Sequence, residues 1–107
     1  ITLPSSGITT MTGGEGPWCH RVGFTKPGLM IIGRNPVSTD AVGTAAMGYP
    51  DPRAPRGKTP FLHCENHLLL AEQAGLGTAD LKQIEIVGQP LEKSVHPFPG
   101  SPMKAAE

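Results

Sequence analysis

The sequence predicts an α/β fold in which a small mixed or parallel sheet with a β-α-α-β core is joined by long Gly/Pro-rich loops. Two short apolar runs, 29–32 and 84–88, have the composition of strands and bracket two helical segments. Fourteen glycines and 12 prolines in 107 residues require much of the chain to be loop. Ile, Leu, Val and Phe make up about a fifth of the residues, so the predicted core is modest.

Residues 1–20 are rich in Gly, Ser and Thr, and two short β-prone stretches lie in or directly after this region. Ile8–Met11 contains β-branched residues and can form a short strand. The following run, 13–17, breaks regular structure with its glycines and proline. Arg21–Thr25 is predicted as a second short strand, with Val22 and Phe24 on one face.

The stretch 29–48 reads as strand, loop and helix. Its first four residues, LMII, are too few for a helix and predict a strand buried on both faces. Gly33 ends that strand, and Pro36 biases the residue before it away from helical angles. Small residues over 41–47 predict a helix that approaches a sheet closely, and Gly48 is the expected C-cap.

The start of this helix offers three candidate caps. Ser38, Thr39 or Asp40 can each accept a hydrogen bond from a free backbone N–H. Within the helix, Gly43 costs about 1 kcal/mol relative to alanine, so we expect tight packing at that position.

The second half of the chain predicts a stiff loop, a helix, a turn and a strand. Tyr49–Pro60 holds four prolines, and a helix follows over about Cys64–Ala74. Gly75 is the expected stop of that helix, with Leu76 making the apolar contact of a Schellman cap. The run 84–88 is the second expected strand, reached by a right-handed crossover if both strands share a sheet.

These elements predict one domain over 1–107, with an ordered core over about 21–90 and a Pro-rich tail over 91–107. The sequence lacks an initiator Met, and we expect it to be a portion of a larger domain. A truncated sheet beside a small core would expose apolar surface, so we also expect the chain to form a homo-oligomer.

Charge and composition exclude several classes of partner. Nine basic and nine acidic residues give zero net charge, which provides no field for nucleic acid or an anionic membrane. No apolar run approaches the roughly 18 residues that span a bilayer. Two cysteines are too few for a disulfide scaffold, and no signal peptide is visible, so the expected location is cytoplasmic. Neither GxGxxG nor GxxxxGK[ST] occurs, and no cofactor is predicted.

The loop before the first helix is the first candidate site. A helix N-terminus favours an anion, so a small anionic ligand is the expected partner. The same side chains can equally serve only as caps and turn formers. With a second wall from the His63–His67 segment, the predicted ligand-binding residues are Arg34, Asn35, Ser38, Thr39, Asp40, His63 and His67.

Three other groups of residues could carry chemistry. On a helix, His63 and His67 would share a face, and an alternative metal site would combine Cys19, His20, His63, Cys64 and His67. Either cysteine beside a histidine could act as a nucleophile. The basic residues Arg34, Arg53, Arg56 and Lys58 could clamp an anion, or simply face water.

Two stretches, NPVSTDAVGTAAMG and ENHLLLAEQAGLGTADLKQIEIVG, resemble the C-terminal half of the bacterial and archaeal proteins of domain-of-unknown-function family 362. That family shows a strand, a D/N-P-V-A-x-D-A-x-x-A-x-x-x-G helix, an A-x-x-x-G-L-G helix end and an I-E-V-x-G strand. The resemblance covers about 28–90. The matching positions are Asn35, Pro36, Val37, Asp40, Ala41, Gly48, Ala71, Gly75, Leu76, Gly77, Asp80, Ile84, Glu85, Val87 and Gly88.

The resemblance implies an α/β domain without an assigned reaction or catalytic residue. Some members carry ferredoxin-type iron–sulfur modules, but two cysteines cannot hold a four-iron cluster. The family's N-terminal half is not part of this sequence, so a site built from both halves would be incomplete. The sequence therefore favours the small-molecule or anion-binding portion of an α/β enzyme. A protein-interaction module using the Pro-rich loop and tail, or a Cys/His metal site, are the alternatives.

Overall fold

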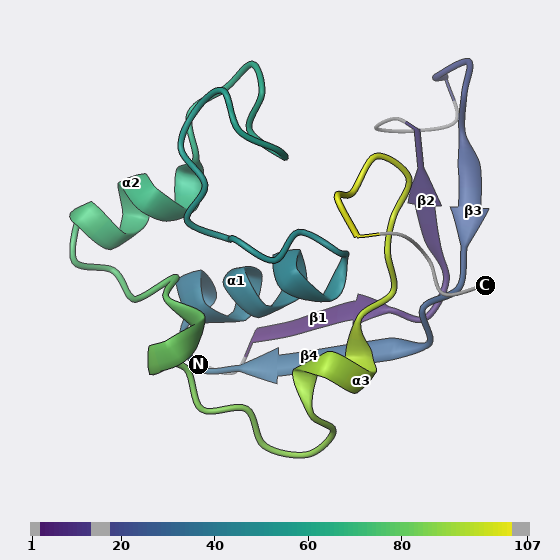
Figure 1. The fold of residues 1–107 in the computed structure, drawn as a ribbon. Helices are drawn as coiled ribbons and strands as arrows, with labels where there is room; N and C mark the ends of the chain where they lie inside the picture. The colour runs from purple at the N-terminus through teal and green to yellow at the C-terminus, as the bar shows by residue number, and fades with distance from the viewer. Residues whose placement is uncertain (1–2, 14–17, 104–107) are drawn as a thin grey trace.

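The computed structural model describes residues 3–13 and 18–103, which form short strands and helices in one compact arrangement (Figure 1). Four strands come first, and all the helices follow them. The elements are β1 (Leu3–Gly7), β2 (Thr10–Thr12), β3 (Gly23–Thr25), β4 (Leu29–Gly33), α1 (Pro36–Ala46), α2 (His67–Gln73), the 3-10 turn η1 (Leu81–Gln83) and α3 (Leu91–Ser94).

The strands form two antiparallel two-stranded sheets, which we refer to together as the ribbon. β1 pairs with β4 from Leu3 opposite Gly33 to Gly7 opposite Leu29, and β2 pairs with β3. Between the two pairs, the Gly28 N–H donates to the Ile8 carbonyl at 3.3 Å. The expected mixed or parallel sheet is therefore wrong, because the chain turns back on itself rather than crossing over a helix. The ribbon also begins earlier than the predicted ordered core.

β4 is confirmed as a strand, but it is not buried on both faces. Its exposure alternates along the strand, and Met30 and Ile32 are 54% and 61% exposed. α1 packs against both strands of the sheet β1–β4, and the side chains of Met30 and Ile32 alternate with those that α1 contacts.

α1 begins at Pro36, three residues earlier than the first predicted cap, Ser38, would allow. Asn35 is the N-cap, and its side chain accepts from the Ser38 N–H at 3.0 Å. Pro36 occupies the first helical position, where its fixed φ suits a helix and a missing N–H costs nothing. At the other end, Gly48 has the predicted capping role with φ +95, and the Gly48 and Tyr49 amides bond back to the helix.

α2 is shorter than predicted, because it begins at His67 rather than Cys64. Asn66 is its N-cap and is almost completely buried. The Asn66 side chain accepts from the Leu68 N–H and donates to the Pro52 and Ala54 carbonyls, which fixes the preceding loop. The stop at Gly75 is confirmed, since the Gly75 and Leu76 amides close a Schellman motif.

The core lies where α1 meets α2 and the segment around η1. Its buried residues are Val37, Ala41, Leu68 and Ala79, with Ala71, Leu81 and Ile84 packed against them. The predicted strand over 84–88 is not formed, and the β-α-α-β core is not found. Ile84 has extended backbone angles, but the segment has no strand partner among the described residues.

The C-terminal region lies against the rest of the chain over the residues described. We refer to residues 95–101 as the strap. Its His96 and Phe98 amides donate to the Ala46 and Met47 carbonyls at 2.7 and 2.9 Å, and the His96 ring contacts the Thr25 hydroxyl at 2.6 Å. Residues 91–103 are thus part of the packed structure rather than a tail outside it. Among the described residues, no helix has the length and apolar character needed to cross a membrane.

Candidate ligand-binding site

The strand–loop–helix stretch singled out in the sequence lines a groove of about 380 Å³. We call it the Arg34 groove. One wall is β4 and the loop after it, and the other wall is the segment 84–87 with residues of α3. Four of the predicted ligand-binding residues line it together: Arg34, Asn35, Ser38 and Thr39.

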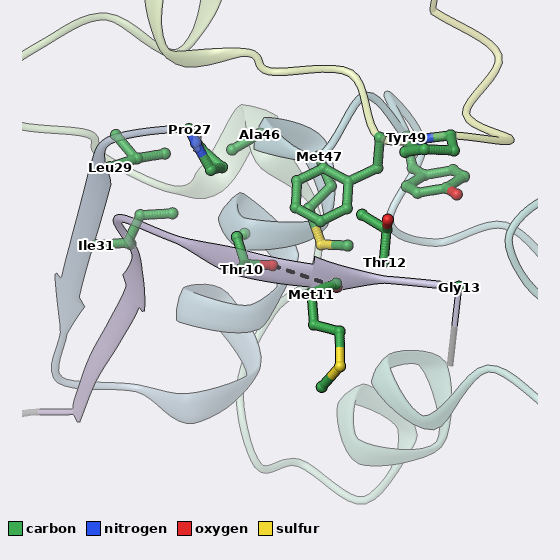
Figure 2. Close-up of a pocket in the computed structure, with 13 residues that line it drawn as sticks. Thr10, Met11, Thr12, Gly13, Pro27, Leu29, Ile31, Ala46, Met47 and Tyr49 are labelled. Carbon is green, nitrogen blue, oxygen red and sulfur yellow. Dashed lines mark hydrogen bonds between the residues drawn. The ribbon is translucent and has the colours of Figure 1, made fainter. Parts of the chain in front are cut away.

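A second cavity, of about 360 Å³, shares Leu29, Ile31 and Ala46 with the first (Figure 2). We call it the Gly43 pocket. It lies between the ribbon, the C-terminal half of α1 and the strap. The sequence did not indicate this pocket, because its walls come from four segments far apart in the chain.

Most polar side chains of the Arg34 groove already have structural partners. The Ser38 hydroxyl donates to the Thr78 carbonyl at 2.9 Å, and the Thr39 hydroxyl donates to the Asn35 carbonyl at 2.7 Å. The Asn35 amide donates to the Leu76 carbonyl at 2.8 Å. These three side chains therefore hold the loop and the α1 start in place.

The N-terminus of α1 offers few donors to an anion. Pro36 has no N–H, the Ser38 N–H is bonded to the Asn35 side chain, and the Thr39 N–H is bonded to the Asn35 carbonyl. The Val37 N–H is the remaining donor of the first turn. Anion binding at this helix start would consequently depend on Arg34 more than on the helix.

Arg34 differs from the other arginines of the predicted basic set. It is exposed at the groove, and no ion pair involves it among the described residues. Arg53 pairs with Glu72 at 2.8 Å and Arg56 pairs with Glu65 at 3.3 Å. The four basic residues are therefore not a single clamp.

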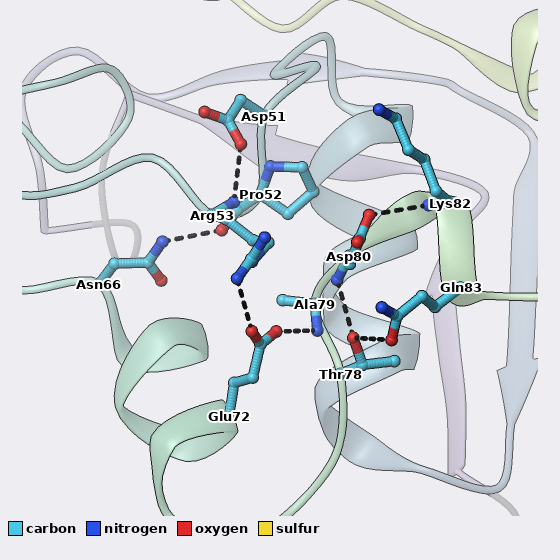
Figure 3. A network of polar contacts seen from close by, with 10 residues as sticks. All are labelled: Asp51, Pro52, Arg53, Asn66, Glu72, Thr78, Ala79, Asp80, Lys82 and Gln83. Atoms are coloured by element: carbon cyan, nitrogen blue, oxygen red, sulfur yellow. Dashed lines mark hydrogen bonds and ion pairs between the residues drawn. The ribbon is translucent and has the colours of Figure 1, made fainter.

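Figure 3 shows why Arg53 is a structural residue. Its guanidinium meets one oxygen of Glu72, while the other Glu72 oxygen accepts from the Ala79 N–H at 2.7 Å. Next to it, the Thr78 hydroxyl accepts from the Asp80 N–H at 3.1 Å. This network joins the Pro-rich loop to α2 and to the turn before η1.

The remaining predicted residues lie away from the groove. Asp40 meets His67 across α1 and α2, with 3.7 Å between Oδ2 and Nε2, but both side chains are mostly exposed. His63 precedes α2, so it does not share a helical face with His67 as predicted. The physical reason is the Asn66 cap, which delays the helix until after both Cys64 and His63.

The alternative metal site gains no support from this arrangement. Within residues 3–13 and 18–103, no three His, Cys, Asp or Glu side chains gather as a metal ion would require. Cys19 and Cys64 are both free thiols, and Cys64 is exposed in the loop before α2.

The segment 84–87 is a groove wall that the sequence suggested only as a strand. Its apolar residues predicted a strand, whereas its position beside β4 depends on long-range packing. Glu85 and Gln89 add polar groups to this wall.

No protein-family model matches the chain, and neither the curated proteins nor the solved structures contain a significant match to it.

Proposed function

We propose that this chain is the ligand-binding portion of an α/β enzyme and that it binds a small molecule with an anionic group in the Arg34 groove. The observation that carries the proposal is that Arg34, which has no ion pair among the described residues, lies in a groove with apolar side chains of β4 and of residues 84–87. Apolar walls with a few placed polar groups are typical of small-molecule sites. The groove volume of about 380 Å³ suits a ligand of one or two rings.

Arg34 would recognise the anionic group. A guanidinium can donate two parallel hydrogen bonds to a carboxylate or phosphate, which fixes both position and orientation. The apolar body of the ligand would lie along Ile32 and Ile86, which line the same groove. Glu85 also lines the groove and would repel an anion placed too far from Arg34.

The resemblance to family 362 agrees with this proposal, because its range of about 28–90 includes β4, the following loop and the segment 84–87. Membership in that family remains part of the proposal. A reaction is not proposed, since the resemblance supplies no catalytic residue.

Phenyl phosphate tests the proposal, because it combines an apolar ring with a dianion. In an ¹⁵N-labelled chain, its addition should shift the amide signals of Arg34, Ile32 and Val87. Arg34→Ala should weaken binding at least about tenfold, the loss expected for one charge-assisted contact. Arg34→Lys should bind phenyl phosphate with intermediate affinity, because lysine keeps the positive charge but lacks the two parallel donors of the guanidinium.

Arg56→Ala is the matched control, because Arg56 is also exposed and lies outside the groove. It should bind phenyl phosphate as the unmodified chain does. Equal binding by Arg34→Ala, or signal shifts away from β4 and 84–87, would rule out the groove as the site.

The interaction-module alternative has less support. It would use the Pro-rich loop and tail, yet the strap already contacts α1 and β3 of the same chain, and the Asn66 side chain already binds the loop at the Pro52 and Ala54 carbonyls.

A further inference from the structure

Part of the shape of the Gly43 pocket comes from α1, the helix that lines it. Gly43 lies in the middle of α1, where glycine is less favourable than alanine. A Cβ added at Gly43 would meet no atom within 4 Å, so the expected tight packing at this position is wrong. Gly43 lines the pocket instead, and the missing side chain leaves space there.

The lining of this pocket is neutral. No acidic or basic side chain is among its described lining residues, and most of its surface comes from apolar groups such as Leu29, Ile31 and Met47. Thr10 and Thr12 supply hydroxyls from one face of β2, whereas Met11 points to the opposite side of that strand (Figure 2). A charged ligand would therefore lose its hydration without gaining an ion pair.

The outer side of the pocket is built by the strap. Phe98 and Pro99 line it, and the Phe98 amide is fixed to the Met47 carbonyl at 2.9 Å. The Tyr49 ring stands beside them and brings one phenolic hydroxyl to the rim. The aromatic rings and Met47 sulfur can contact the face and edge of a bound ring.

We propose that the Gly43 pocket binds a neutral, flat, mostly apolar small molecule of one or two rings. A single polar group on that molecule would meet the Tyr49 or Thr12 hydroxyl. The volume of about 360 Å³ lies at the lower end of the range for small-molecule sites. This site is separate from the anion site at Arg34, although the two share part of their walls.

Indole is a suitable probe, because it is neutral and bicyclic and carries one N–H donor. Its addition to the ¹⁵N-labelled chain should shift the amide signals of Gly43, Met47, Ile31 and Phe98. Gly43→Leu should weaken indole binding at least tenfold, because the new side chain occupies the pocket. Gly43→Ala adds only a methyl group and should retain most of the binding.

Two comparisons separate this site from the Arg34 groove. Arg34→Ala should bind indole as the unmodified chain does, and Gly43→Leu should retain binding of phenyl phosphate. Tyr49→Phe should bind indole several-fold more weakly if the phenol accepts the indole N–H, with no effect on phenyl phosphate.

The proposal is overturned if indole shifts map to the exposed face of β4 or to residues 84–87. It is also overturned if Gly43→Leu binds indole unchanged. If Gly43→Leu does not fold, the amide signal shifts that indole causes in the unmodified chain still test the proposal. Shifts at both Gly43 and Phe98 support binding in the pocket, and their absence contradicts it.

Discussion

At the scale of single residues, two asparagines determine where the helices begin. Asn35 and Asn66 cap α1 and α2, whereas the sequence favoured Ser38, Thr39 or Asp40 for the first helix and a start near Cys64 for the second. A local signal for Asn35 existed, because a good cap followed directly by proline is typical of a helix start. For Asn66 the deciding contacts are the Pro52 and Ala54 carbonyls, which lie 12 or more residues away and cannot be read locally.

Asn66 should be among the most sensitive residues to substitution. Asn66→Ala removes a cap and leaves two carbonyls in a buried region without their donor, so we expect a loss of about 3 kcal/mol in the free energy of unfolding. Urea unfolding followed by circular dichroism measures this loss. Asn66→Asp keeps the cap acceptor but loses both donors, and should also be strongly destabilised.

Gln73→Ala provides the comparison for this test, because Gln73 is exposed in the last turn of the same helix. It should change the free energy of unfolding by less than about 0.5 kcal/mol. A loss below about 1 kcal/mol for Asn66→Ala would mean that the loop carbonyls find water and that Asn66 acts only as a cap.

At the scale of elements, the sequence predicted correctly those features that depend on residues close together in the chain. The strand at 29–32 and the helix ends at Gly48 and Gly75 are confirmed, since apolar runs and left-handed glycines act within a few residues. The strand predicted at 84–88 is not formed. Its residues favour extended backbone, but a strand also needs a partner strand from a distant part of the chain. The antiparallel ribbon was missed for the same reason, as its pairing joins residues up to 30 positions apart.

The two helix-ending glycines differ in their surroundings, which gives a matched pair of variants. Both have positive φ, +77 at Gly75 and +95 at Gly48. An added Cβ at Gly75 meets nothing, whereas at Gly48 it comes within 3.0 Å of the Pro97 Cα in the strap. Gly75→Ala should lose about 1 kcal/mol in the free energy of unfolding from backbone strain alone.

Gly48→Ala should lose at least about 1 kcal/mol more than Gly75→Ala, because the strap must also move. Thermal or urea unfolding of both variants measures the difference. Equal losses would show that the strap does not pack on the end of α1 in solution, and would also weaken the case for the Gly43 pocket.

At the scale of the whole molecule, the two sides of β4 differ in how much of their apolar side chains is exposed. α1 packs on the ribbon, while Met30 and Ile32 project from β4 with more than half of their surface exposed. The sequence predicted a modest core with exposed apolar surface, and these side chains provide such a surface.

Four of the seven predicted ligand-binding residues line one groove, because they are close together in the sequence. The predicted positions of His63 and His67 depended on where α2 begins, and that start is determined by contacts with a distant loop.

Self-association of the chain remains a prediction, and we expect it to use β4. Adjacent apolar side chains beside a strand edge favour pairing with a second copy. Light scattering across a concentration series should give an average mass above 11.2 kDa. Met30→Lys with Ile32→Lys should lower that mass towards the monomer.

Leu70→Lys is the control for this experiment, because Leu70 is 53% exposed on α2, away from β4. It should leave the mass unchanged. A mass of one chain at every concentration would contradict self-association, and an equal effect of Leu70→Lys would place the contact elsewhere.

The strap gives the Gly43 pocket a particular place in the order of folding. Its bonds to Ala46 and Met47 connect residues about fifty positions apart, so they form only after a long loop has closed. The ribbon and α1 have more local contacts and can form before it. The pocket is therefore complete only when the strap has docked, and a ligand bound there would stabilise the fully folded chain over forms in which the strap is undocked.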